Sequence, residues 1–391
     1  MNAITLKLGY IPLLDAAPLI VAQEMGFAAE QGLALNLIKA PSWSSLRDML
    51  AFGQVDAAHM LSPVPVAGAL GLAPASAGLS AVSVLSVNGN VIGVKQELAE
   101  RMADAGHDFG FCDALSVGRA LSEATTGPLV IGVPFPFSMH VELLLYWLAG
   151  IPGDLASRVT IRTVPPPLIA NAIAAGEIDA FCVGEPWGTI AVEKGLGSLI
   201  LPGSAIWQFA PEKVLAMRTD WVEAEQSLSA RLIRAVWRAG QWLGAPGSAD
   251  LASEMLGRSN ALDLPAELLE RALTGAMVVT PGGATRRAPR FIEFYQGVAG
   301  FPWRSQAQWI GARLAQRHGK PLDAAMAAAA SVFRADLHRY ALQGHTDLPG
   351  ASSKIEGAIR ALTPVASESG ALHLLPDQFF DGRIFDPNGL V

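Results

Sequence analysis

Several polar side chains follow strand-like segments in otherwise apolar surroundings. In open α/β sheets, ligands lie outside the carboxyl ends of the strands, so residues at such ends are candidates for one binding cleft. The candidates come from distant parts of the chain and include aromatic, amide, imidazole, carboxylate and ammonium groups: Trp43, His59, Ser62, Asn88, Asn90, His140, Glu185, Trp187 and Lys213.

The types of three of these side chains suit a small, weakly hydrated oxyanion. His140 lies in the first turn of a predicted helix, whose free backbone N–H groups attract anions, and its imidazole can donate a hydrogen bond. Lys213 supplies a point charge, and Asn88 can donate through its amide. Each also has an ordinary interpretation: His140 and Trp43 as core residues, Lys213 as solvated, and Asn88 as part of a turn with Gly89. Spacing alone leaves the two interpretations open.

The enzyme classes with recognisable motifs find no support. The sequence has no GxSxG elbow, HExxH pair, P-loop or GxGxxG after a strand. The seven histidines show no metal-ligand spacing, and the two cysteines, Cys112 and Cys182, cannot form a zinc cluster. We therefore expect a binding protein with no catalytic residue, no metal and no cofactor.

Composition limits the choice of fold and partner. The chain has 391 residues, 51% of them apolar and 16% charged, which predicts two or three folding units with a large core. A net charge of −7 argues against direct nucleic-acid binding. Residues 57–94 contain no charged side chain, but prolines and glycines interrupt them, so we predict buried strands and short helices rather than a membrane span. The first residues lack a basic, then apolar, export pattern, which predicts a cytoplasmic location.

Hydrophobic periodicity predicts two β-α-β-α-β units. The first has strands near 5–11, 33–40 and 55–61, and the second has strands near 129–134, 159–164 and 178–187. Such alternation predicts a mostly parallel sheet covered by helices on both faces. The runs near 86–94 and 198–209 read as extended crossovers. Beyond residue 220 the pattern is helical, including one run over 322–343, until it is lost in the last 26 residues.

Seven stretches resemble the substrate-binding proteins of nitrate and bicarbonate ABC transporters (NrtA/CmpA-type). Because the sequence shows no export signal, it also resembles the cytoplasmic nitrate/nitrite sensors of the same family (NasS-type). The stretches include LGYIPLLDAAPLIVAQEMGFAAEQGL, VNGNVIGV, VPPPLIANAIAAGEIDAFCVGEPW and APEKVLAMRTDWV. The resemblance implies an α/β, bilobal periplasmic-binding-protein-like fold of type II, with two hinged lobes and a helical C-terminal extension. Residues 1–87 plus 206–391 would form lobe 1 and residues 88–205 lobe 2, with the ligand between them.

The resemblance also assigns roles to particular residues. Asn88 matches an amide that holds the ion in relatives, although transport proteins carry the longer Gln there. His140 and Lys213 match a histidine and a lysine that contact the ion. Bicarbonate-binding relatives that use calcium carry an acidic residue at the Lys213 position, so Lys213 indicates nitrate or nitrite. Met60 stands close to where transport-type relatives carry a Trp, and Trp43 or His59 would substitute for that ring.

The function implied first is a cytoplasmic nitrate/nitrite sensor that holds a NasT-type RNA-binding antiterminator of nitrate assimilation genes and releases it on anion binding. The first alternative is the substrate-binding component of an ABC importer for nitrate, bicarbonate or another small anion. An enzyme on the same fold is the second. The sensor would contact a protein partner but neither nucleic acid nor membrane.

Overall fold

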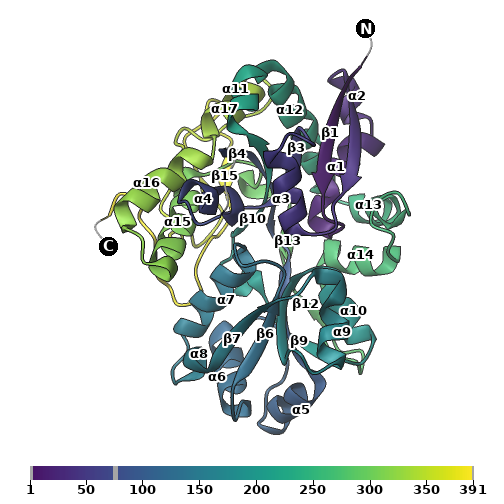
Figure 1. Ribbon diagram of the computed structural model, residues 1–391, viewed down its shortest axis with the longest axis vertical. Coiled ribbons are helices and arrows are strands. Elements are labelled where there is room, and N and C mark those ends of the chain that lie inside the picture. Colours follow the sequence, from purple (N-terminus) through teal and green to yellow (C-terminus); the bar gives the residue numbers. More distant parts are fainter. Residues whose placement is uncertain (1–2, 74–77, 390–391) are drawn as a thin grey trace.

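Two α/β lobes lie one above the other in the computed structural model, which describes residues 3–73 and 78–389 (Figure 1). Each lobe is built on its own sheet, and the chain passes between the lobes at Asn88–Asn90 and again at Pro202–Pro211. The lobe boundaries predicted at 87/88 and 205/206 remain a prediction. No helix among the described residues is long and apolar enough to cross a membrane.

The sheet of lobe 1 has six strands in the order β13-β4-β10-β3-β1-β2. Strand β1 pairs in parallel with β2 and β3, while β10 pairs antiparallel with β3 and β4, and β13 antiparallel with β4. The strands are β1 (Ile4–Tyr10), β2 (Leu33–Lys39), β3 (Ala57–Leu61), β4 (Leu79–Asn88), β10 (Pro211–Arg218) and β13 (Ile292–Glu293).

The sheet of lobe 2 has five strands in the order β7-β6-β8-β5-β9. Strand β6 pairs in parallel with β7 and β8, whereas β5 pairs antiparallel with β8 and β9. The strands are β5 (Asn90–Lys95), β6 (Leu129–Val133), β7 (Val159–Thr163), β8 (Ala180–Gly184) and β9 (Gly197–Pro202).

The prediction of mostly parallel sheets was wrong, because both sheets are mixed. The chain enters lobe 2 on β5 directly after β4, and it returns to lobe 1 from β9 to β10 through a short connection that holds only one turn of 3-10 helix, so neither passage uses a covering α-helix. A strand that arrives in this way runs against its neighbours, whereas parallel pairing needs a long crossover. The extended run predicted near 86–94 is divided between two strands, β4 and β5, since Asn88 has a φ of 60° and Gly89 a φ of 100°.

Short helices cover both sheets, and serine side chains cap two of them. Ser42 accepts a hydrogen bond from the Ser45 N–H, and Ser138 one from the Val141 N–H, so both cap their helices. Lobe 1 contains η1 (Leu14–Ala16), α1 (Ala17–Glu24), α2 (Phe27–Glu30), α3 (Trp43–Ala51) and α4 (Pro63–Ala69). Lobe 2 contains α5 (Gln96–Asp104), α6 (Ala114–Ala124), α7 (Met139–Ala149), α8 (Leu155–Arg158), η2 (Pro166–Leu168), α9 (Ile169–Ala174) and α10 (Trp187–Glu193).

The part after β10 returns to lobe 1 and is largely helical, as predicted. The run over 322–343 is two helices, because the backbone at Phe333 and Arg334 leaves the helix to bond to Ala81 of β4. Its helices are α11 (Thr219–Ala224), α12 (Gln226–Leu243), α13 (Ser248–Gly257), α14 (Ala266–Thr274), α15 (Arg304–His318), α16 (Leu322–Val332) and α17 (Ala335–Leu342). Short elements complete it: η4 (Gln296–Val298), β11 (Ala276–Val278), β12 (Thr285–Arg287), β14 (Thr363–Pro364) and β15 (His373–Leu374). One further short helix, η3 (Gly203–Ala205), precedes β10 in the returning crossover.

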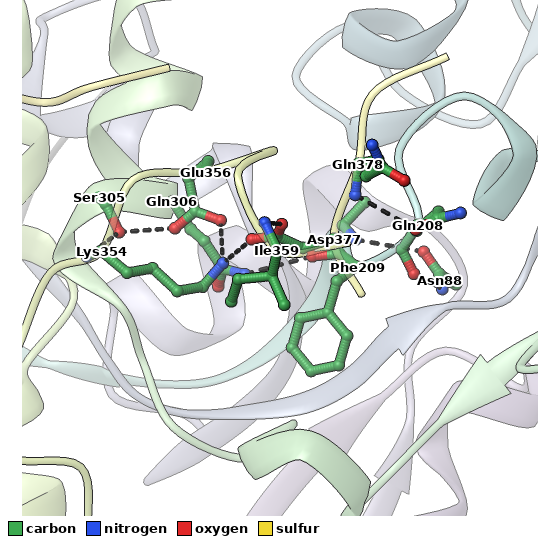
Figure 2. Close-up of polar contacts among 11 residues, drawn as sticks. Asn88, Gln208, Phe209, Ser305, Gln306, Lys354, Glu356, Ile359, Asp377 and Gln378 are labelled. Atoms are coloured by element: carbon green, nitrogen blue, oxygen red, sulfur yellow. Dashed lines mark hydrogen bonds and ion pairs between the residues drawn. The ribbon is translucent and has the colours of Figure 1, made fainter. Parts of the chain in front are cut away.

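After α17 the chain forms a segment without helices, which we call the C-terminal strap (residues 344–389). Figure 2 shows its polar contacts. Lys354 lies 2.5 Å from Oε2 of Glu356 and also pairs with Asp377, and Ser305 of α15 donates to Oε1 of Glu356 at 2.6 Å. Further along, Gln378 N–H donates to the side chain of Gln208 in the returning crossover. The strap therefore ties α15 to that crossover.

Aromatic side chains join the strap to both lobes. Phe379 stacks on Trp207 of the crossover and Trp309 of α15, with ring centroids 4.8 and 5.8 Å apart. Tyr146 of α7, in lobe 2, packs against Phe379 and Phe380 and donates a hydrogen bond to Asp381 at 2.8 Å. This aromatic cluster (Tyr146, Trp207, Trp309, Phe379 and Phe380) spans the two lobes and the connection between them.

Replacing Lys354 by Met tests the ionic network of the strap. The variant leaves Glu356 and Asp377 buried without their ammonium, and breaking a buried pair from one side costs about 3–5 kcal/mol. We expect that loss in the free energy of unfolding by urea. As a control, Arg383→Met removes an ion pair to Asp381 from a side chain that is 76% exposed, and its cost is below about 1 kcal/mol. Equal effects of the two changes would contradict a buried network.

Candidate functional site

Five ionisable side chains meet where the two lobes touch, and we call them the interlobe cluster: Asp15, His59, His140, Glu212 and Lys213. Each is at most 1% exposed. Four belong to lobe 1, on η1, β3 and β10, and the histidine of α7 comes from lobe 2. Such a concentration of charge in a sealed interface needs a physical explanation, since charged groups are expensive to bury.

The ammonium of Lys213 is held between two carboxylates. Its Nζ lies 2.7 Å from Oδ2 of Asp15 and 2.9 Å from Oε1 of Glu212. Adjacent residues of a regular strand point to opposite faces, but the pairing of β10 with β4 shifts register on both sides of Lys213. This bulge lets two successive side chains enter the same interface. The ring of Trp43 lies on a further side, 5.6 Å from Nζ.

Asp15 is fixed by a second basic group. Nε2 of His59 lies 2.8 Å from Oδ1, while Oδ2 faces Lys213. Burial by itself would raise the pKa of Asp15, but the two basic neighbours outweigh it and hold that pKa well below its usual range. Burial lowers the pKa of His59, and Asp15 only partly opposes this. At neutral pH Asp15 is therefore ionised and His59 neutral.

Glu212 is the member of the cluster that both lobes contact. Besides Lys213, it accepts a hydrogen bond from Nδ2 of Asn90 at 3.0 Å, and Nδ1 of His140 lies 3.2 Å from its Oε1. Burial raises the pKa of Glu212 to about 7, with Lys213 opposing the shift, and burial and Lys213 together lower the pKa of His140 well below its ordinary value. The N–H of Leu14 also donates to the carbonyl of Glu185 across the interface at 3.2 Å. The lobes are thus closed on each other.

Polar atoms without partners surround the ammonium. Among the described residues, Trp43 Nε1, His59 Nδ1, His140 Nε2 and Ser86 Oγ are buried and have no hydrogen-bond partner. Ser86 lies opposite Lys213 in the pairing of β4 with β10. Leaving a buried donor unpaired costs about 1–3 kcal/mol, so several in one place indicate a site that a ligand completes. An indole N–H and an ammonium suit a ligand that carries acceptors and negative charge.

The structure brings together five of the residues predicted from sequence: Trp43, His59, Asn90, His140 and Lys213. Of the remaining predicted residues, Met60, Glu185 and Trp187 lie outside the cluster. Met60 is buried on β3 next to His59, and successive strand residues face opposite sides of a sheet. Glu185 accepts hydrogen bonds from the Thr189 N–H of α10, and burial raises its pKa to about 7. Trp187 begins α10 with its indole N–H buried and unpaired by the described residues, and no contact joins it to the interlobe cluster.

Asn88 departs from the predicted role. Its Nδ2 donates to the carbonyls of Gln208 and Arg290, and its Oδ1 accepts from the Ala210 N–H (Figure 2). Its amide is thereby used to join the two crossovers, and these three bonds go to the backbone of Gln208, Arg290 and Ala210 rather than to the interlobe cluster. The physical reason is its left-handed backbone at φ 60°, which ends β4 and turns the side chain toward the returning chain. Asn90, two residues on, is the amide that lies in the cluster.

Sequence reasoning missed the two carboxylates. Asp15 and Glu212 each stand as an isolated acidic residue within an apolar stretch, in IPLLDAAPLIVA and in FAPEKVLAM. Acidic side chains are almost never fully buried unless paired, so an acidic residue in a core-like run was a usable signal for a buried ion pair. Among the described residues, no group of His, Cys, Asp and Glu is arranged to hold a metal ion.

A larger cavity lies apart from the interlobe cluster. It has a volume of about 620 Å³ and lies on lobe 1, among α3, α4, α11 and the junction of α16 and α17. Two of its basic side chains are ion-paired, Arg47 with Asp48 and Arg334 with Asp336 and Glu223. The other two, Arg304 and Arg339, donate to the carbonyls of Ala330 and Ala351. No member of the interlobe cluster lines it, so its size gives no reason to place the ligand there.

Comparison with known proteins supports the fold and points to one group of relatives. A sequence profile described as the NMT1-like family matches residues 2–257. The nitrate/nitrite binding protein NrtA of Nostoc sp. is 29% identical over 389 residues, which cover 97% of this chain and 82% of that protein. The nitrate import ATP-binding protein NrtC of Synechocystis sp. is 32% identical over 81% of this chain, but the match spans only 46% of its own length.

Among solved structures, the periplasmic nitrate-binding protein NrtA from Synechocystis superimposes with a TM-score of 0.83 at 27% identity. The match covers 99% of this chain and 96% of that one. It confirms the predicted bilobal periplasmic-binding-protein-like fold.

Replacing Asn88 by Ala tests whether this residue joins the crossovers or binds the ligand. The change removes three buried hydrogen bonds and puts a less tolerant residue at positive φ, so we expect the ligand-free protein to lose about 1–3 kcal/mol of unfolding free energy in urea. Asn171→Ala, on the exposed side of α9, is the matched control and shifts stability by less than about 0.5 kcal/mol. An unchanged unfolding midpoint together with lost anion binding would show that Asn88 binds the ligand instead of joining the crossovers.

Proposed function

The chain belongs to the NMT1-like family, and from this membership and the interlobe cluster we propose that it is the substrate-binding component of an importer for a small monovalent oxyanion, nitrate or nitrite. One observation carries the proposal: the indole N–H of Trp43 is buried beside a buried ammonium and two histidine rings, and it has no hydrogen-bond partner among the described residues. The named functions of the relatives, nitrate/nitrite binding and nitrate import, agree with it.

Nitrate and nitrite accept hydrogen bonds and donate none, so their site must consist of donors. Trp43 donates only, whereas each neutral imidazole has a single N–H and donates to the ion only when that N–H is on the nitrogen turned away from the carboxylate. Lys213 has three N–H groups, of which two face carboxylates, and the third remains for the ion. His140 belongs to lobe 2 and the other donors to lobe 1, so an ion held by all of them stabilises the closed arrangement. Its differential affinity for that state is what closes the lobes.

The same chemistry disfavours turnover. The cluster holds no activated nucleophile: Cys182 is buried on β8, and burial raises the pKa of its thiol well above the ordinary value. The curated relatives are named as binding and transport proteins. We propose reversible binding without chemical change of the ion.

A cytoplasmic nitrate/nitrite sensor is the second candidate, with the same cleft and a NasT-type antiterminator as its partner. The C-terminal strap favours it, because the strap contacts α7, the returning crossover and α15 and would shift when the lobes separate. A partner could read that change of surface. Gel filtration of this protein with a purified NasT-type protein, with and without nitrate, distinguishes the two candidates: a complex that nitrate dissociates supports the sensor.

A thermal-shift panel tests the proposed ligand class. A ligand that binds only the folded form adds RT ln(1 + [L]/Kd) to stability, about 2.7 kcal/mol at 100 times Kd. We expect nitrate or nitrite to raise the melting temperature, and chloride, sulfate and bicarbonate with calcium to have little effect. A shift with bicarbonate and calcium alone would contradict the proposal.

Trp43→Phe tests the donor set directly. The variant keeps the ring against Lys213 and His59 but removes the indole N–H, and a hydrogen bond to a charged group contributes about 1.5–3 kcal/mol, so the Kd for nitrate rises at least about tenfold. The melting temperature of the ligand-free protein stays nearly constant, because that N–H has no partner there. Trp303→Phe, which removes an equally buried and unpaired N–H next to Phe301, is the control and leaves the Kd within twofold. Calorimetric titration measures both; an unaltered Kd in the Trp43 variant would remove this residue from the site.

A further inference from the structure

The interlobe cluster contains more negative than positive charge before any ligand enters. Asp15 and Glu212 share one ammonium, that of Lys213, and the two histidines are neutral because burial lowers the pKa of each. With both carboxylates ionised, the cluster has a net charge of −1. A monovalent anion placed beside Lys213 would make the net charge of the cluster −2. The cluster lies in an interface where its side chains are at most 1% exposed.

A sealed site resists such a charge. Like charges at close range in a medium of low dielectric repel strongly, and groups that can take up a proton then do so. One side chain of the cluster is therefore expected to take up a proton when the anion binds.

Glu212 is the group best placed to take up that proton. Among the described residues, the charged and titratable groups that face it are Lys213 on its own strand, His140 on α7, Asp15 on η1 and Cys182 on β8. Asp15 keeps its charge because Lys213 and His59 hold one of its oxygens each, whereas Glu212 has one cation for two oxygens and meets only the neutral amide of Asn90 at the other.

The pKa values agree with that geometry. Burial raises the pKa of Glu212 to about 7, so it changes charge near neutrality, while the pKa of Asp15 stays well below its usual range. A bound anion adds a further negative charge and raises the pKa of Glu212 again. The carboxyl that is half-protonated without the ion becomes protonated with it.

We propose that each nitrate or nitrite ion is bound together with one proton, which Glu212 takes up from solvent and returns when the ion leaves. The inference rests on the proposed anion-binding function. Binding of an anion with a proton leaves the net charge of the cluster at −1, so the closed interface never holds two uncompensated charges. Protonated Glu212 also releases the ammonium of Lys213 from its second carboxylate partner and so frees it for the ion.

The sign of the pH dependence follows from linkage. Below about pH 7 the free protein already carries the proton on Glu212, so the Kd is constant. Above this pH the proton must be taken up on binding, and the Kd for the anion rises about tenfold per pH unit until the pKa of the anion-bound form is reached. Affinity is therefore highest in mildly acidic solution and falls as the pH rises.

Calorimetric titration of the full chain with sodium nitrate at pH 8, in buffers of different ionisation enthalpy, measures the protons taken up. We expect the observed enthalpy to depend on the buffer with a slope of nearly one proton per ion, and the Kd to rise between pH 7 and 8.5. In Glu212→Gln, which keeps the shape of the side chain without its titration, the slope falls to zero and the Kd varies less than about twofold over that range. Glu185→Gln is the control. The carboxyl of Glu185 is also buried and also has its pKa raised to about 7, but it accepts hydrogen bonds from Thr189 and not from the cluster. We expect this variant to take up as many protons on binding as the unchanged protein.

Each other outcome has a definite meaning. Nitrate and nitrite binding with no buffer dependence and a flat Kd would overturn the proton inference while leaving the proposed function intact. Proton uptake that survives in Glu212→Gln would overturn the assignment to Glu212. Absence of binding of either ion at every pH from 6 to 8.5 in the unchanged protein would overturn the proposed function itself.

Discussion

The burial of the Lys213 ammonium between two carboxylates is the interaction on which the rest of the structure depends. An isolated ammonium in such an interface would lose its proton, and an isolated carboxylate would gain one. The bulge in β10 brings Glu212 to the same side as Lys213, and the turn after β1 brings Asp15 to the other. Lobe 2 completes the arrangement with His140 and Asn90, so the ionic centre is finished only when the lobes are closed. The same group of charges therefore organises the fold of lobe 1 and responds to lobe closure.

The connection between the lobes lies within a few residues of this centre. Ala210, whose N–H is bonded to Asn88, stands two residues before Glu212, and Gln208 and Phe209 bond to the strap and to α15 (Figure 2). A displacement of β10 at the ion site is thus passed directly to the backbone that links the lobes. Coupling of this kind needs no long pathway, because the ligand and the connection share one strand.

Much of the fold could be predicted from hydrophobic periodicity, and the features that could not be predicted have identifiable physical causes. The helix starts at Ser42 and Ser138 were predictable because capping is a local property of the sequence. Strand direction was not, since β5 and β10 owe their antiparallel pairing to the path of the chain between lobes. For the site, residue type and position singled out His59, His140 and Lys213, which meet in the interlobe cluster, and their binding of an anion stays a prediction. The bonds of Asn88 to the returning crossover could not be predicted, because they depend on a positive φ that spacing does not reveal. The carboxylates of Asp15 and Glu212 were overlooked because acidic groups rarely suggest anion binding.

The aromatic cluster gives lobe movement a thermal signature. Tyr146 belongs to α7 and Trp309 to α15, with Phe379 of the strap in contact with both, so separation of the lobes exposes ring surface whichever side the strap follows. Exposure of apolar area raises the heat capacity. Closing the lobes on an ion therefore lowers the heat capacity, even though the ion itself is small and polar. As a result, the binding enthalpy becomes more favourable on warming. A plot of affinity against reciprocal temperature is accordingly curved, and its curvature measures how far the two halves of the molecule travel.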